Sequence, residues 1–296
     1  MGRILVSGLV NIETTAPVRQ FPIPYYPIDY PFFGVNTAAS GVGFNLALAL
    51  RTLGDEVTLC SLTGSDFPAE YLRRELQTAG IGTDGLLSGL RQTPNSVVLY
   101  DAEGTRQIYC DLKDIQEASY PFSEAMVAGA DLVAACNINF NRPLLHLARA
   151  AGKPIATDVH VLSDLHDDYN REFMACADLL FLSDEAIGGD YEAFLQALGQ
   201  LYGSKIIVLG RGSRGAALYL RQTGQVYSLP APQVGPVVNT AGAGDALFSA
   251  FLHYYVKGMP PLEALALAQL FAAAKIRVSG AAKGFLTEEA LEALRR

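Results

Sequence analysis

The run Asn239–Phe248 reads N-T-A-G-A-G-D-A-L-F and joins three small residues to an acid at the start of an apolar, helical stretch. A glycine-rich turn that opens a helix leaves backbone N–H groups unpaired, and the helix dipole adds partial positive charge there. Such a turn, formed here by Gly242, Ala243 and Gly244, can bind phosphate. Asp245 would repel that phosphate, unless it takes a proton from a hydroxyl group that attacks the bound phosphoryl group. The residues therefore indicate phosphoryl transfer, although an ordinary loop-to-helix turn would show the same pattern.

Five further short motifs occur along the chain, and each of them is weak alone. They are Ser40-Gly41-Val42-Gly43-Phe44-Asn45-Leu46-Ala47, Gly64-Ser65-Asp66, Gly80-Ile81, Gly104-Thr105-Arg106 and Gly212-Ser213-Arg214-Gly215. In this order, and together with Asn239–Phe248, they resemble the signatures of the ribokinase/PfkB carbohydrate kinase family. The resemblance covers nearly the whole chain and implies a ribokinase-like fold with kinase activity.

Membership of this family would imply transfer of the γ-phosphoryl group of ATP to a hydroxyl group of a small sugar or sugar-like substrate. Asp245 would be the catalytic base, and the turn Gly242–Asp245 would bind the transferred phosphoryl group. Mg²⁺ would bridge the phosphates, held largely by water and by the nucleotide itself. The resemblance places the following residues on the nucleotide side: Ser183, Gly210, Gly212, Gly215 and Thr240. For the two glycines of the 212–215 motif, an ordinary turn is an equal explanation.

On the substrate side the resemblance points to Glu13, Gly41 and Asn45. Asn45 would bind a hydroxyl group, although an asparagine near a helix start could simply cap the helix. Glu13 stands where the family carries an aspartate after its first strand, and it could instead pair with an arginine. Arg106 would reach the sugar from a hairpin, or remain an exposed arginine without a ligand. Asn139 is a further candidate, because it follows a strand at the side where ligands of such sheets bind.

Three positions depart from the family pattern. The run Ser183-Asp184-Glu185-Ala186 stands where the family's N-x-x-E organises phosphate and Mg²⁺, so Asp184 or Glu185 would have to act on the metal through water. Asn239 replaces the aspartate of the second signature, which puts in doubt the monovalent-cation site that many members build nearby. Gly210-Arg211 replaces a Thr-Leu pair, which removes one side-chain contact to phosphate.

Composition limits the partners and the compartment. Of 296 residues, half are apolar and 18% are charged, which predicts a large core in one unit spanning residues 1–296. The net charge of −8 argues against nucleic acid or an anionic membrane as a partner. The 4 cysteines are widely spaced, so a disulfide framework or a zinc site is not expected and a reducing cytoplasm fits. We expect neither a signal peptide nor a membrane span.

Strand-like and helix-like segments alternate along most of the chain. The expected strands are Arg3–Leu9, Glu56–Leu62, Leu132–Cys136, Pro154–Asp158, Leu179–Leu182 and Lys205–Leu209. The expected helices are Phe44–Leu53, Pro68–Ala79, Pro143–Ala151, Tyr191–Tyr202, Gly244–Val256 and Pro261–Val278. This alternation predicts an α/β fold of three layers, αβα, around a mostly parallel sheet, with ligands at the carboxyl ends of the strands.

Two segments interrupt the alternation, and we predict insertions at 12–38 and 90–115. Thr14–Val35 contains five prolines among many aromatic residues, which excludes a helix and a central strand. Thr93–Leu112 reads as a hairpin. The family resemblance implies that both form a small β lid over the sugar and that two subunits pair through it, so we expect a homodimer. The alternative is a surface loop that packs its aromatic rings on the main body.

Two other functions remain open. A nucleoside kinase on the same fold could use the aromatic lid to stack a base. A non-catalytic ligand-binding homologue would explain the altered N-x-x-E and second-signature residues. The presence of Asp245 after the glycine-rich turn favours catalysis over binding alone, because an acid that faces phosphate does not help binding.

Overall fold

A nine-stranded sheet forms the centre of the molecule in the computed structural model, which describes residues 1–295. The strand order is β13-β12-β11-β10-β9-β8-β1-β4-β5, and the strands from β11 to β5 are parallel. The antiparallel hairpin β12–β13 extends the sheet beyond β11. The bounds are β1 (Arg3–Ser7), β4 (Glu56–Thr63), β5 (Leu86–Ser88), β8 (Leu132–Ala135), β9 (Ile155–Val161), β10 (Leu179–Ser183), β11 (Ile206–Gly210), β12 (Ala216–Leu220) and β13 (Gln225–Leu229).

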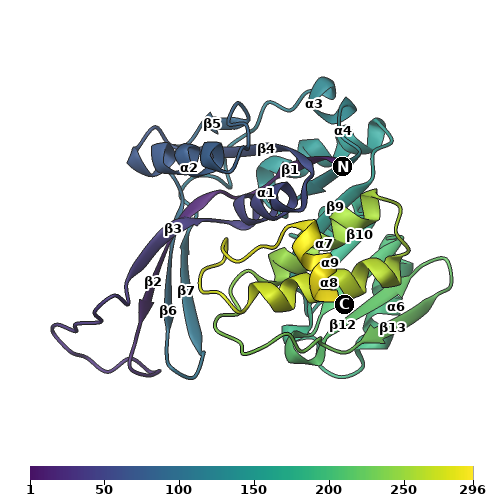
Figure 1. Cartoon of the computed structure of the whole chain (residues 1–296). Coiled ribbons are helices and arrows are strands. Elements are labelled where there is room, and N and C mark those ends of the chain that lie inside the picture. The colour runs from purple at the N-terminus through teal and green to yellow at the C-terminus, as the bar shows by residue number, and fades with distance from the viewer. Residues whose placement is uncertain (296) are drawn as a thin grey trace.

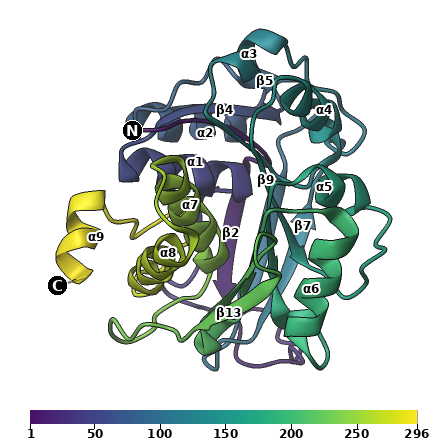
Figure 2. The ribbon, with the colours of Figure 1, turned by 90° about the vertical axis from the view of Figure 1, so that its right-hand side faces the viewer.

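Helices cover both faces of this sheet (Figure 2). One face carries α1 (Val42–Leu53), α2 (Phe67–Thr78), α7 (Ala243–Val256), α8 (Pro261–Lys275) and α9 (Glu288–Arg295). The other carries α3 (Glu124–Ala128), α4 (Arg142–Ala150), α5 (Arg171–Cys176) and α6 (Tyr191–Tyr202). Within residues 1–295, no helix has the length and apolar character needed to cross a membrane.

Residues of one strand pack alternately against the two helical layers. In β1, Ile4 and Val6 belong to the core under α1 and α7, whereas Leu5 belongs to the core under α4 and α6. Successive side chains of a strand point to opposite faces, so a sheet covered on both sides needs continuous apolar strands. The predicted αβα layout with a mostly parallel sheet is therefore confirmed. The predicted elements agree to within a few residues, but α3, α5, α9, β5 and the hairpin β12–β13 were not predicted.

A second, four-stranded sheet of the described residues projects from one side of the body (Figure 1). Its order is β3-β2-β6-β7, with bounds β2 (Asn11–Pro17), β3 (Asn36–Ser40), β6 (Asn95–Tyr100) and β7 (Arg106–Asp111). The hairpin predicted within Thr93–Leu112 is confirmed. The exclusion of a central strand is wrong for residues 14–17, because β2 pairs with β3 on one side and with β6 on the other. Pro17 is tolerated because β3 pairs with β2 only as far as Thr15, so the missing N–H of Pro17 breaks no hydrogen bond of the sheet.

The aromatic residues between β2 and β3 do not pack on the main body. Tyr25, Phe32 and Phe33 have relative exposures of 89%, 85% and 100%. The alternative of a surface loop with its rings packed on the body is therefore wrong, and the loop presents an uncovered apolar surface at the far end of the small sheet (Figure 1).

The strand order places a crevice beside β1. From β1 the sheet is built outward to β4 on one side and to β8 on the other, so the direction of strand addition reverses there. Loops at the carboxyl ends of parallel strands diverge at such a switch point and leave room for a ligand. Because β2 begins only four residues after β1 ends, the small sheet starts at this same edge.

Candidate active site

A cavity of about 450 Å³ lies at the switch point, between the main sheet and the small sheet. Six of the predicted site residues line it: Glu13, Gly41, Asn45, Arg106, Gly242 and Asp245. They come from β2, the start of α1, β7 and the start of α7. Residues that are far apart in the sequence are therefore brought together at the edge of the sheet that the strand pattern predicts.

The carboxylate of Asp245 is oriented by the first turn of another helix. Asn45 Nδ2 donates a hydrogen bond to Asp245 Oδ2 at 2.7 Å. The N-cap residue of α1 is Gly41, without a side-chain hydrogen bond, so the alternative in which Asn45 caps its helix is wrong. Asn45 Oδ1 is buried and has no hydrogen-bond partner within residues 1–295. One asparagine thus holds the acid and leaves an acceptor oxygen for a ligand.

Backbone N–H groups at the start of α7 surround this acid. The N–H of Ala243 donates to the carbonyl of Thr240 at 3.1 Å. Contrary to the expectation for this turn, that N–H is therefore not available to a ligand. The N–H groups of Gly242, Gly244 and Asp245 donate to no acceptor among the described residues. A Cβ added at Gly244 would meet no atom within 4 Å, so packing does not explain this glycine. A ligand that approaches the backbone closely would explain it.

Further acceptors lie on the small sheet. Glu13 accepts a hydrogen bond from Ser40 Oγ at 3.3 Å, and Asn11 Nδ2 donates to Ser96 Oγ at 2.8 Å. Asn11 Oδ1 is buried without a partner in the described chain. Asn11 was missed by the sequence analysis, although it precedes Glu13 by two residues on one strand and so shares its face. Unpaired oxygens at the wall of a cavity suit a ligand that donates several hydroxyl groups.

Burial sets the protonation behaviour of the two acids. Burial raises the pKa of Asp245 to about 6, although the Asn45 hydrogen bond and the charge of His160 oppose the shift. Burial also raises the pKa of Glu13, while the Ser40 hydrogen bond and the charge of Lys275 lower it. Asp245 is therefore ionised at neutral pH yet more basic than an exposed aspartate, as a general base requires.

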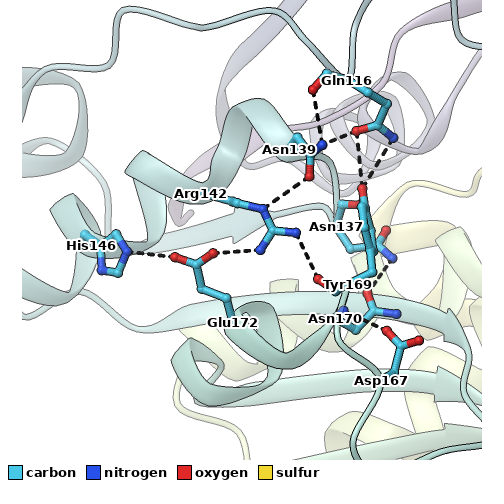
Figure 3. Close-up of polar contacts among 9 residues, drawn as sticks. All are labelled: Gln116, Asn137, Asn139, Arg142, His146, Asp167, Tyr169, Asn170 and Glu172. Atoms are coloured by element: carbon cyan, nitrogen blue, oxygen red, sulfur yellow. Dashed lines mark hydrogen bonds and ion pairs between the residues drawn. The ribbon is translucent and has the colours of Figure 1, made fainter.

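The structure brings Asn137, rather than Asn139, to the cavity. Both polar ends of the Asn139 side chain are engaged, because Nδ2 donates to the Gln116 carbonyl (3.1 Å) and Oδ1 accepts from Arg142 Nε (3.2 Å). Figure 3 shows these contacts within a polar network that includes Tyr169. Gln116 lines the cavity, so Asn139 supports a lining residue instead of facing the substrate.

The residues expected on the nucleotide side lie outside this cavity. Ser183 and Gly210 are register partners at the carboxyl ends of β10 and β11. A Cβ at Gly215 would lie 2.0 Å from the Leu229 carbonyl oxygen, so packing of an ordinary turn accounts for that glycine. A Cβ at Gly212 would meet nothing within 4 Å, and Thr240 is exposed. Gly212 and Thr240 thus keep room for a nucleotide, whereas Gly215 needs no ligand to explain it.

The residues after β10 do not form a metal site of their own. Asp184 accepts from Arg214 Nη2 at 2.6 Å and lies 3.6 Å from Arg211 Nε, so its charge is already paired. Glu185 is exposed. In the described part of the chain, no group of three or more His, Cys, Asp or Glu residues could hold a metal ion. This donor set does not fit a protein-held Mg²⁺, and the phosphates of the nucleotide would supply most of its ligands.

Comparison with known proteins places the chain in a family. The profile of the pfkB family of carbohydrate kinases matches residues 1–288. The acarbose 7(IV)-phosphotransferase of Actinoplanes sp. is 26% identical over 262 residues, covering 87% of this chain and 86% of the relative. The pseudouridine kinase of Escherichia coli is 27% identical over 242 residues, covering 77% of each. A microbiome-derived acarbose kinase has the same fold, with a TM-score of 0.87, 24% identity and coverage of 100% and 99%. The chain belongs to the pfkB family of carbohydrate kinases, and its fold is ribokinase-like.

We expect Asp245→Asn to stabilise the folded protein at pH 8. A carboxyl group whose folded-state pKa is raised contributes stability only at low pH, and this contribution is lost as pH rises through the folded-state pKa of about 6. An asparagine at position 245 carries no charge, so its burial does not have the free-energy cost of a buried carboxylate. Its side-chain oxygen can still accept the Asn45 hydrogen bond. The free energy of unfolding in urea should rise by about 1–3 kcal/mol at pH 8, and the gain should shrink by more than half at pH 4.5.

The exposed Asp84→Asn is the matched control and should change stability little at either pH. An Asp245→Asn protein that is less stable than the wild type at pH 8, or a gain that does not depend on pH, would contradict the buried, costly charge.

Proposed function

We propose that the chain transfers the γ-phosphoryl group of ATP to a hydroxyl group of a small sugar or sugar-like substrate. The observation that carries this proposal is the Asp245 carboxylate, held by Asn45 beside unpaired N–H groups and facing a cavity with many hydrogen-bonding side chains. A binding protein would gain nothing from a costly ionised acid at a phosphate-binding turn, so catalysis is the better explanation.

In the proposed reaction the substrate lies in the cavity, with one hydroxyl group against Asp245. As the hydroxyl oxygen forms a bond to the γ-phosphorus, its proton passes to the Asp245 carboxylate. The bond from the γ-phosphorus to the bridging oxygen breaks, and ADP leaves with that electron pair. The N–H groups of Gly242 and Gly244 stabilise charge on the transferred group, and each well-aimed donor is worth about 3 kcal/mol. Mg²⁺ bound to the nucleotide would supply neutralisation of the phosphate charge.

The small sheet would act as the lid of this site and mark residues 12–38 and 90–115 as insertions into a single kinase domain. Ser96, Val98, Arg106 and Ile108 line the cavity from β6 and β7, opposite the start of α7. A lid that closes over the substrate excludes water, which would otherwise compete as the phosphoryl acceptor.

A sugar fits this cavity better than a nucleoside. Among the described residues, no Phe or Tyr side chain lines the cavity, so the aromatic loop does not offer a ring on which to stack a base. The wall from the small sheet is instead aliphatic or polar, as Val98 and Ser96 illustrate. A nucleoside kinase remains the second candidate, because aliphatic side chains can also cover a base and a nucleoside kinase occurs among the relatives.

The acceptor class is tested by measuring ADP release with ATP and Mg²⁺ across a panel of sugars, sugar acids and nucleosides. We expect release to depend on the acceptor and to be strongest for a sugar or sugar derivative, with one phosphate ester formed for each ADP. Phosphorylation of nucleosides alone would favour the second candidate, a nucleoside kinase. A wild-type protein that binds ATP but phosphorylates no acceptor of any class would contradict the proposed function.

Glu13 should bind substrate hydroxyl groups. It lines the cavity and has no ion pair with Arg19 or Arg106; Arg19 pairs with Asp29 instead, at 3.0 Å. A carboxylate that accepts from a hydroxyl group contributes about 1.5–3 kcal/mol for each charge-assisted bond. Glu13→Gln should therefore raise KM for the acceptor by about tenfold or more and leave KM for ATP nearly unchanged.

Glu103→Gln, in the exposed turn between β6 and β7, is the matched control and should change neither KM. If Glu13→Gln changed both KM values alike, Glu13 would order the lid and would have no direct role in binding the sugar.

We further propose that two copies of the chain associate through their small sheets. The loop between β2 and β3 exposes Tyr25, Phe32 and Phe33 almost completely, and a cluster of this kind is typical of an interaction surface. Sedimentation velocity at micromolar concentration should give twice the chain mass of 31.7 kDa. The double substitution Phe32→Ser and Phe33→Ser should give the monomer. A wild-type monomer under these conditions would contradict the association.

A further inference from the structure

The last residue of α8, Lys275, is completely buried beside the turn that opens α7. Its Nζ donates a hydrogen bond to the carbonyl oxygen of Ala241. Within residues 1–295 it forms no ion pair with a carboxylate. Burial of an ammonium group without a close counter-ion is costly, so a residue of this kind is retained only where its charge or its contact has a use.

The contact with Ala241 fixes the direction of the next N–H group. In a planar trans peptide the C=O and the following N–H point in opposite directions. When Lys275 draws the Ala241 carbonyl to its own side, the N–H of Gly242 must point away from Lys275. Gly242 lines the cavity, and its N–H has no acceptor in the described chain. The other side of residue 241 is also fixed, because its N–H donates to Asn239 Oδ1 at 2.7 Å.

The charge of Lys275 acts on the proposed base. Burial lowers the pKa of Lys275 to about 8, and Asp245 and Glu13 oppose this shift, so the ammonium form predominates at neutral pH. Asp245 is faced by Asn45 from α1, by Asp158 and His160 from β9, by Cys136 at the end of β8 and by Lys275 from α8. Lys275 and His160 favour the ionised carboxylate, whereas Asp158 and burial oppose it.

We propose that Lys275 is a positioning residue for phosphoryl transfer, whose ammonium group aims the Gly242 N–H at the transferred group. The inference rests on the proposed function. It also accounts for the uncertain monovalent-cation site. K⁺ and Na⁺ bind oxygen ligands, and in this turn the Ala241 carbonyl oxygen already faces the ammonium group of Lys275. Asn239 Oδ1 is engaged as well, so the chain supplies its own cation and needs none from solution.

The first test compares Lys275→Met with Lys283→Met. Methionine keeps an unbranched chain without the charge, and Lys283 is an exposed lysine in the segment that follows α8. Lys275→Met should lower kcat at least tenfold with little change in KM for the acceptor. Its kcat should also decline at a higher pH on the acid side than that of the wild type, because Asp245 loses a cation that favours its ionised form. Lys283→Met should match the wild type in both respects.

The second test uses the wild type and needs no folded variant. Its kcat should agree within twofold in KCl, NaCl and choline chloride at equal ionic strength.

A nucleotide-binding measurement on the variant adds a readout other than activity. Calorimetry should show that Lys275→Met weakens binding of a non-hydrolysable ATP analogue more than binding of ADP, because only the former carries the γ-phosphate.

The outcomes distinguish failure of the proposed role of Lys275 from failure of the proposed kinase function. A wild type that requires K⁺ would overturn the proposal, as would a folded Lys275→Met with wild-type kcat and an unshifted pH profile. If Lys275→Met does not fold, Lys275→Ala in the presence of K⁺ or methylammonium replaces it, and the added cation should restore activity at least threefold. Failure of both cations to do so would overturn the proposal. A wild type that phosphorylates no acceptor and binds no nucleotide would contradict the proposed function itself, and this inference with it.

Discussion

The hydrogen bond from Asn45 to Asp245 joins the first turns of two helices across 200 positions of the chain. Both helices, α1 and α7, lie on the same face of the sheet and start at its ligand-binding edge. The bond fixes which oxygen of Asp245 is free, and it holds the start of α7 against the wall formed by β1 and α1. The geometry of the acid, the N–H groups and the cavity therefore depends on a contact that only the complete fold can form.

The site concentrates charges where burial makes them costly. Asp245, Glu13 and Lys275 lie close enough to affect one another, and burial shifts all three toward their neutral forms. The attraction between Lys275 and each of the two acids opposes that shift. Such an arrangement lowers stability, and the apolar core on both faces of the sheet supplies the stability that tolerates the charges of this site.

The small sheet is attached to the body at points that belong to the site. Its strand β2 follows β1 almost directly and carries Glu13, while β3 leads into Gly41 at the start of α1. Asp66 caps α2 and also accepts hydrogen bonds from the backbone and hydroxyl group of Thr93, just before β6. The motif Gly64-Ser65-Asp66 therefore has a structural explanation. Movement of the small sheet would move Glu13 relative to Asp245, which would couple closure of the proposed lid to the proposed substrate pocket.

The sequence predicted the layers, most of the elements and the shared location of Asp245 and Asn45. Apolar strands and a glycine-rich turn before a helix can be recognised from short stretches of sequence alone. It did not predict Lys275, since a lysine at the end of an alanine-rich helix looks like an ordinary exposed residue and only tertiary packing buries it. It misplaced Asn139, because a one-turn helix after β8 turns that side chain toward Gln116. It also excluded residues 14–17 of β2, since the rule against proline in a central strand does not apply to Pro17, which lies beyond the last residue paired with β3.

The central claim, that Asp245 is the base in phosphoryl transfer, is tested most directly by a single-turnover measurement of phosphate-ester formation with the preferred acceptor. Wild type and Asp245→Asn are compared at saturating ATP, with ATP affinity measured separately by calorimetry. The account predicts a transfer rate lower by about 10²–10⁴-fold in Asp245→Asn, with ATP affinity unchanged within about threefold. A transfer rate within threefold of the wild type, in a variant that still binds ATP and acceptor, would contradict it.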